Sequence, residues 1–404
     1  MLHFQNIQPS RRTINRVYYN TQQISSIDYL QQLINTHIWS RIKYHAPPPP
    51  PVKQLHEPSC QVTGTSSPTA DYSPSQLTDA IHRNQMESKY LTNIAKYSPV
   101  YHGSQIQTSI WPQLPLARRA SVMVLLFLGK MGELRVILTR RSKKLRAFSG
   151  HISLPGGKAD TLDETEWDVA RRETEEEIGI SADDDYLKSH SGFTIHKINT
   201  LPAYLSRTFL GVRPCVGFID FHHASNKAIS SILLNPGESS AIFSVPLKDF
   251  LQPKPRRYEL KECLKQSYIK TKWGGIPWNL RSFIFPIHNP HEVPWLESIQ
   301  DLSSEEDETE QDMEFGEKTR NVWGLTANIL RDLAMLTYGG AKHFHELVGE
   351  EDLIHSLATV GKQMQGRPRS EFEKTMTNNR RGVGFDQVLP DHEVQRLKTL
   401  YSVI

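Results

Sequence analysis

Apolar residues first gather into strand-length segments between residues 121 and 140. Residues 121–128 are apolar and rich in strand-forming side chains, and residues 134–140 alternate between apolar and polar positions. The segment between them, Gly129–Gly132, favours a turn, so the two segments are predicted to form a β-hairpin. Three later segments are also expected to be strands, namely residues 208–219, 241–245 and 282–287.

Residues 165–178 have the periodicity of a helix. Four of them share one stripe at about 100° per residue and are therefore expected to face the core: Trp167, Ala170, Thr174 and Ile178. Thr161 or Asp163 is expected to cap the start of this helix, and Gly179 provides a left-handed stop. A second helix is expected at residues 321–336, followed by short helical patches in a polar sequence.

The first 75 residues differ in composition from the rest. Residues 1–27 hold three arginines but no Asp or Glu, and residues 47–51 are all proline. We interpret residues 1–75 as a disordered or targeting extension with a proline-rich linker, and a mitochondrial presequence or a solvated tail would each fit its start. The expected division then continues with a helical lead-in (76–117), a catalytic domain (118–345) that holds an acidic, solvated loop near 301–317, and a C-terminal extension that packs on this domain (346–404).

Charge and composition exclude several classes of protein. The 47 Lys and Arg residues nearly balance the 44 Asp and Glu residues, and no basic–aromatic surface pattern indicates nucleic acid. No apolar run approaches the roughly 20 residues of a membrane span. The three cysteines are widely spaced and form neither a disulfide framework nor a zinc motif, which favours a reducing compartment.

Glutamates are concentrated on the stripe that neighbours the apolar face of helix 165–178. Glu173, Glu176 and Glu177 are three and four residues apart and therefore lie side by side on a helix, where each like-charge pair costs roughly 0.2–0.5 kcal/mol. A hard divalent cation reverses this repulsion, and the upstream Gly156 and Gly157 suit a loop that approaches phosphate. A glutamate-rich helix by itself is more often only solvated, so the wider pattern decides.

The wider pattern closely resembles the Nudix box. A Pro-Gly-Gly turn, an acid at Glu164 and the run Arg-Glu-Thr-x-Glu-Glu-x-Gly-Ile at residues 172–180 follow its order and spacing. Residues 137–157 also resemble the second signature of the coenzyme A diphosphatase branch. Its fungal peroxisomal members are resembled by four further segments, residues 205–208, 234–238, 273–275 and 323–326. The resemblance implies an α+β fold in which a mixed β-sheet lies between helices.

The same resemblance implies roles for the residues that match the box. Glu173 and Glu177 would be ligands of Mg²⁺ or Mn²⁺, and Glu176 a third ligand or the base that orients water. Arg172 would orient these carboxylates through charge-assisted hydrogen bonds. Glu238, after an Asn-Pro turn, would be a further acid near the site, although an ordinary surface loop is the alternative.

The expected substrate is a small molecule, coenzyme A or an acyl or oxidised form. Arg140, Arg141 and Arg146 belong to a basic segment that suits phosphate recognition, and they are expected to bind substrate together with Gly156 and Gly157. Hydrolysis would give 3′,5′-ADP and 4′-phosphopantetheine. The alternatives are other substrates, such as 8-oxo-dGTP or ADP-ribose, and a different class of protein, a Nudix binding module without catalytic activity.

The resemblance implies a peroxisomal location, and the acid-free start implies a mitochondrial one. The oligomeric state is left open.

Overall fold

The computed structural model describes residues 88–102, 108–221, 232–251, 262–299, 301–302, 313–314, 317–378 and 382–402. The predicted extension of residues 1–75 lies outside these ranges, as does most of the acidic loop expected at 301–317. Among the described residues, no helix is both long enough and apolar enough to cross a membrane.

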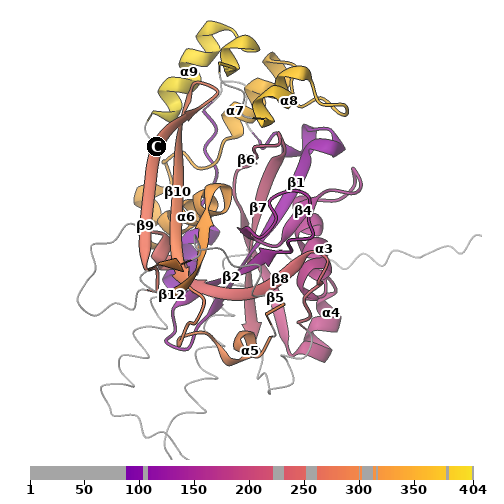
Figure 1. Ribbon diagram of the computed structural model, residues 1–404, viewed down its shortest axis with the longest axis vertical. Helices are drawn as coiled ribbons and strands as arrows, with labels where there is room; N and C mark the ends of the chain where they lie inside the picture. The colour runs from indigo at the N-terminus through magenta and orange to yellow at the C-terminus, as the bar shows by residue number, and fades with distance from the viewer. Residues whose placement is uncertain are drawn as a thin grey trace, which may run out of the picture. The chain divides into compact units, whose positions relative to one another are not determined.

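A mixed sheet lies at the centre of the described chain (Figure 1). Its strands are β1 (Arg119–Leu128), β2 (Leu134–Arg141), β3 (Ile152–Ser153), β4 (Gly156–Lys158), β5 (Phe193–Thr200), β6 (Tyr204–Leu205), β7 (Gly211–Phe221) and β8 (Ser239–Pro246). Strands β1 and β7 are parallel, and the other pairs are antiparallel. The predicted hairpin is present, because Leu128 pairs with Leu134 across β1 and β2.

A second sheet is antiparallel, with the order β11-β12-β10-β9. Its strands are β9 (Lys265–Trp273), β10 (Ile276–Pro286), β11 (Met313–Glu314) and β12 (Glu317–Trp323). The strand predicted at residues 282–287 is the second half of β10. The sequence did not predict β9, because this edge strand is exposed on both faces and so lacks an alternating apolar pattern.

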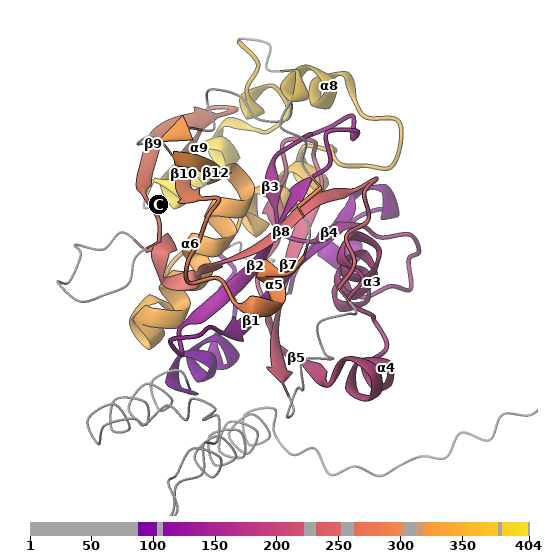
Figure 2. The same ribbon diagram turned by 60° about the horizontal axis from the view of Figure 1, so that its bottom comes forward.

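Helices flank both sheets (Figure 2). They are α3 (Glu166–Ile178), α4 (Asp184–Tyr186), α5 (Pro294–Glu297), α6 (Gly324–Gly339), α7 (Glu351–His355), α8 (Glu371–Thr377) and α9 (Asp391–Tyr401), and residues 88–96 are also helical. Helix α3 packs on β1 and β7, whereas α6 packs on β10 and β12. The helix predicted at 321–336 begins only at Gly324, because Asn321 and Trp323 pair with β10.

Helix α3 starts and ends with well-defined caps. Its N-cap is Thr165, whose hydroxyl accepts a hydrogen bond from the Asp168 N–H at 3.2 Å, while the Asp168 carboxylate accepts from the Thr165 N–H at 3.0 Å. The prediction that Thr161 or Asp163 caps the helix was therefore wrong, because the reciprocal capping box places the N-cap at Thr165, directly before the first helical residue. The predicted stop is confirmed, since Gly179 has φ 73°.

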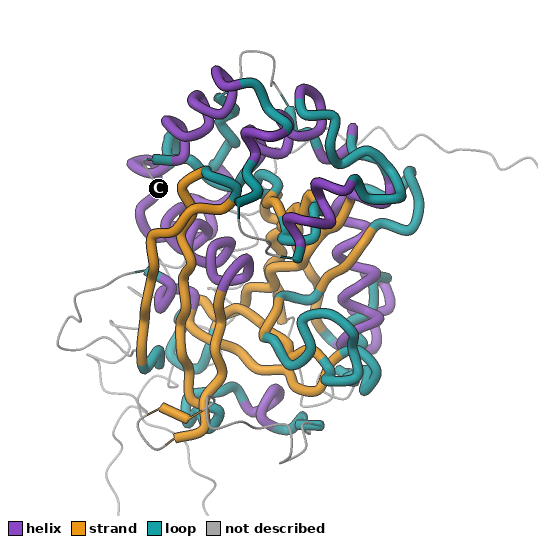
Figure 3. The backbone as a smooth tube through the Cα atoms, turned by 45° about the horizontal axis from the view of Figure 1, so that its top comes forward, coloured by secondary structure: helices purple, strands orange, loops and turns teal. Residues whose placement is uncertain are grey.

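Two apolar clusters support these layers. The first lies between α3 and the mixed sheet. It includes Ala170 and Ile178 of the predicted apolar stripe, together with Met123 of β1. The second joins the C-terminal helices to earlier parts of the chain, for example Leu357 and Leu397 to Phe209. Figure 3 shows these helices gathered at one end of the strands.

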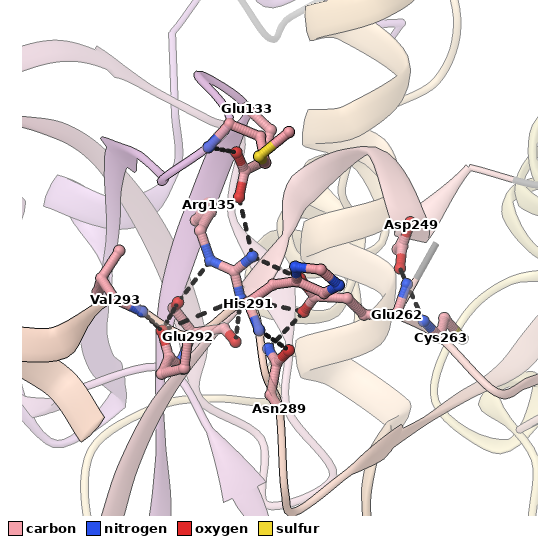
Figure 4. Close-up of polar contacts among 11 residues, drawn as sticks. Glu133, Arg135, Asp249, Glu262, Cys263, Asn289, His291, Glu292 and Val293 are labelled. Atoms are coloured by element: carbon pink, nitrogen blue, oxygen red, sulfur yellow. Dashed lines mark hydrogen bonds and ion pairs between the residues drawn. The ribbon is translucent and has the colours of Figure 1, made fainter. Parts of the chain in front are cut away.

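A buried ion pair fixes β2 against the second half of the chain (Figure 4). Arg135 is fully buried, and its Nη1 lies 2.6 Å from Oε1 of Glu262. Its Nε donates to Ser244 Oγ at 2.7 Å, and Asn289 donates to Glu262 Oε2 at 2.6 Å. Because each of these partners is satisfied, the pair is held without leaving a buried charge alone.

Candidate active site

Helix α3 presents its glutamates against strand β4. The fit is closest at Gly157, where a Cβ would lie only 2.3 Å from the carboxylate carbon and Oε1 of Glu173. At Gly156, which has φ +154°, a Cβ would lie 2.4 Å from the Ser121 carbonyl oxygen. The Gly-Gly pair therefore allows the strand backbone to approach both β1 and a helix carboxylate.

Glu177 is the most buried carboxylate of this face. Its Oε1 lies 3.7 Å from Arg141 Nη1, and the Gly156 backbone forms a hydrogen bond with the carboxylate. Its Oε2 is buried and accepts no hydrogen bond within the described chain. Burial, together with the charges of Glu173 and Glu238 and against that of Arg141, raises the pKa of Glu177 to about 8.

Three further carboxylates, Glu173, Glu176 and Glu238, belong to the same region. Burial raises the pKa of Glu173, and the charges of Glu176 and Glu238 add to this rise against the opposing effect of Arg172. Glu176 is exposed to solvent. Glu238 lies in the loop that follows Asn235, whose N–H donates to the Glu177 carbonyl at 3.1 Å. The structure thus brings the distant Glu238 to the carboxylates of the helix.

Arg172 connects several of these groups through one guanidinium. Its Nε donates to Glu164 at 2.8 Å, its Nη1 to Glu173 at 3.1 Å, and its Nη2 to the Lys158 carbonyl at 2.8 Å. Burial lowers the pKa of Arg172, but the hydrogen bond with Glu164 and the charge of Glu173 outweigh it, so the net shift is upward. The contact with the Lys158 carbonyl was not predictable from the sequence, because a backbone acceptor leaves no signal in residue type.

This region of the chain is similar in sequence to known proteins. A family model described as a NUDIX domain matches residues 117–266. The chain is 40% identical over 337 residues to peroxisomal coenzyme A diphosphatase 1 of Saccharomyces cerevisiae, covering 78% of this chain and 96% of that relative. The chain belongs to the Nudix hydrolase family. Its mixed sheet with flanking helices is the Nudix fold that the sequence predicted.

Other Nudix relatives match shorter stretches. Nudix hydrolase 15, mitochondrial, from Arabidopsis thaliana is 33% identical over 221 residues, which cover 55% of this chain and 59% of that relative. Peroxisomal coenzyme A diphosphatase NUDT7 from Mus musculus is 32% identical over 137 residues, which cover 34% of this chain and 50% of that relative.

Nudix hydrolases generally use divalent metal ions, and the residues of the box fit such an ion. Among the described side chains, no group of three or more His, Cys, Asp or Glu already converges as a ligand set, because Arg172 holds Glu173 and Arg141 faces Glu177. Two observations still favour a cation. Glu177 Oε2 is buried without a partner among the residues that the structure describes, and Gly157 leaves a space that Glu173 enters. Carboxylate oxygens are the donors that hard divalent ions prefer.

The three predicted substrate arginines lie in different surroundings. Arg141 faces the Nudix box, as described above. Arg140 is buried, and after the larger effect of burial its charge lowers the pKa of Arg320 against the opposing effect of Asp301. Arg146 is exposed in the loop after β2, and within the described residues no contact joins it to the box glutamates. The structure therefore brings together Arg141 and the carboxylates, and the roles of the other two arginines stay predictions.

Proposed function

We propose that this Nudix hydrolase cleaves the diphosphate bond of coenzyme A and its acyl or oxidised forms. The observation that carries the proposal is the position of Arg141, which extends from the 137–157 signature to within 3.7 Å of Glu177 in the box. Substrate signature and hydrolytic motif thus meet at one point. The name of the yeast relative, which is similar over most of both chains, supports the same substrate.

The reaction consumes one water molecule. Its oxygen forms a bond to one phosphorus of the diphosphate, and the bond between that phosphorus and the bridging oxygen breaks. The bridging oxygen leaves with the other phosphate and is protonated as the medium requires. The products are 3′,5′-ADP and 4′-phosphopantetheine, or its acyl form.

The proposed metal ion is Mg²⁺ or Mn²⁺, and Glu173 and Glu177 would hold it. When bound, such an ion neutralises negative charge on the diphosphate and lowers the pKa of the attacking water. The protein's own part begins with Arg172, which keeps the Glu173 carboxylate directed toward β4. Glu176 is exposed on the same face and is proposed to orient the water and accept its proton, with Glu238 as a second candidate for this role.

Substrate binding is assigned to groups around this face. Arg141 presents a guanidinium fork that suits a phosphate oxygen pair. Gly156 and Gly157 allow the backbone to approach the diphosphate, and Arg140 and Arg146 are proposed to add positive charge. The proposed substrate is a small molecule and not a nucleic acid.

Side-by-side kinetics test the substrate. We expect the full chain with Mg²⁺ to give a kcat/KM for coenzyme A that clearly exceeds those for 8-oxo-dGTP and ADP-ribose. An equal or lower value for coenzyme A would contradict the substrate and favour a nucleotide-sanitising enzyme. Binding of these compounds without turnover of any of them would favour a non-catalytic Nudix module.

We also propose a peroxisomal location, with the mitochondrion as the alternative. The yeast relative is named as peroxisomal, and the Arabidopsis relative as mitochondrial. Imaging the full chain beside a chain that lacks residues 1–45 distinguishes them. A mitochondrial signal that depends on these residues would contradict the peroxisomal proposal.

A further inference from the structure

Three aromatic side chains from distant parts of the chain meet beside the Nudix box. The ring of His151 lies 5.6 Å from that of Phe148 and 5.1 Å from that of Trp323, measured between centroids. Phe148 and His151 belong to the turn between β2 and β3, whereas Trp323 ends β12 of the second sheet. The contact between β3 and β12 therefore assembles this aromatic cluster of Phe148, His151 and Trp323.

The cluster is open to solvent. Phe148 is 43% exposed and Trp323 is 39% exposed, so both present ring surface that the fold does not cover. Phe148 also has φ 53°, in the left-handed region that a bulky side chain rarely adopts. Because the ring is exposed, its burial contributes little free energy to offset this unfavourable backbone conformation. Residues with strained backbones are concentrated at functional sites.

The cluster adjoins the residues that would hold the diphosphate. The His151 carbonyl accepts a hydrogen bond from the Arg141 N–H at 2.9 Å, and the Arg141 side chain extends to Glu177. Burial and then the charge of Arg141 lower the pKa of His151, so the Arg141 guanidinium and the His151 ring lie close enough to influence each other. The turn that carries Phe148 also carries Lys143 and Arg146.

We propose that Phe148, His151 and Trp323 form the stacking site for the purine base of the nucleotide half of the substrate. The proposal rests on the proposed function for its substrate class. A nucleobase offers a flat π-face that stacks on aromatic side chains without sequence-specific hydrogen bonds. The basic residues of the same turn attract the phosphates attached to that nucleoside, so base and phosphate would be recognised side by side.

Variants of two cluster residues test the site with coenzyme A as the substrate. We expect Trp323→Ala to raise KM about tenfold, as loss of one stacking partner does, while kcat changes less than twofold. Trp323→Phe should recover most of the loss. Phe148→Gly should also raise KM, and glycine suits the left-handed backbone, so this variant keeps the fold. Tyr268→Ala, at an exposed aromatic of the edge strand β9, is the matched control and should leave KM unchanged.

Binding measurements separate the base site from the proposed reaction. Calorimetry of the full chain with Mg²⁺ uses adenosine 3′,5′-bisphosphate and inorganic pyrophosphate as probes. Trp323→Ala and Phe148→Gly should weaken the bisphosphate about tenfold and leave pyrophosphate unaffected. Equal weakening of both probes, or no effect on either, would overturn the base site. The unchanged chain could fail to hydrolyse coenzyme A while the two variants still weaken bisphosphate binding. That result would support the base site and overturn the proposed function.

Discussion

At residue 157 a hydrogen atom leaves room for the Glu173 carboxylate, which occupies the space that a Cβ would take. We expect Gly157→Ala to displace this carboxylate and to lower kcat/KM for coenzyme A about 100-fold, as misplacement of a catalytic group by about 1 Å can. Steady-state kinetics with saturating Mg²⁺ measure the effect.

Gly366→Ala is the matched control, because a Cβ there meets no atom within 4 Å. Its kcat/KM should equal that of the unchanged chain. If Gly157→Ala also kept full activity, the close packing of β4 on Glu173 would have no catalytic importance.

Individual residues were predictable where the motif fixes both type and spacing. The spacing placed Glu173 and Glu177 on one helix face, and the structure agrees. The adjacent arginines gave no such guide. Arg140 and Arg141 look equivalent in the sequence, but the pairing of β2 with β8 shifts between them, and the Nη1 of Arg141 lies 3.7 Å from Glu177. Which of two adjacent strand residues lies toward α3 depends on how the sheet assembles, and the sequence alone does not show this.

At the scale of elements, the start of α3 positions the whole box. The Thr165 capping box satisfies N–H groups that the first turn would otherwise leave unpaired. We expect Thr165→Ala to lower the free energy of unfolding by about 1 kcal/mol, as measured by chemical denaturation.

Thr161→Ala is the comparison for this prediction, because Thr161 was one of the two caps, with Asp163, that the sequence predicted. It should change the free energy of unfolding by much less than Thr165→Ala. The reverse order of the two effects would mean that the helix starts earlier than the structure shows.

Elements were predictable where their side chains are buried. The strands β1 and β2, which are buried along almost their whole length, and the helix α3, which is buried along one face, carry the expected apolar patterns. Strand β9 does not, and the boundary at Gly324 was misplaced because the apolar pattern runs on from β12 into α6. Pairing between strands, rather than local pattern, decided both cases.

At the scale of the whole molecule, the C-terminal segment is tied to the start of β1. Arg118 and Glu373 form a buried ion pair with 2.6 Å between Nη2 and Oε2, although 255 positions separate them. Glu373 also accepts the Met364 N–H at 2.6 Å. A single sequence gives no signal for such a distant partner. We propose that residues 346–404 act as a structural extension of the Nudix domain.

Glu373→Gln should leave Arg118 buried without a counter-charge and cost about 3–5 kcal/mol in the free energy of unfolding. Chemical denaturation of the full chain measures this cost. Glu371→Gln, at an exposed glutamate of the same helix, is the control and should have little effect. A small cost for Glu373→Gln would mean that the extension does not support the domain.

The most direct test of the central claim is the identity of the products formed from coenzyme A. Mass spectrometry of the reaction with Mg²⁺ should show 3′,5′-ADP and 4′-phosphopantetheine in equal amounts. Glu177→Gln should abolish their formation while the fold is retained, and Glu175→Gln, at an exposed glutamate on another side of α3, should not. Unchanged product formation by Glu177→Gln, or no cleavage of coenzyme A by the unchanged chain, would contradict the account.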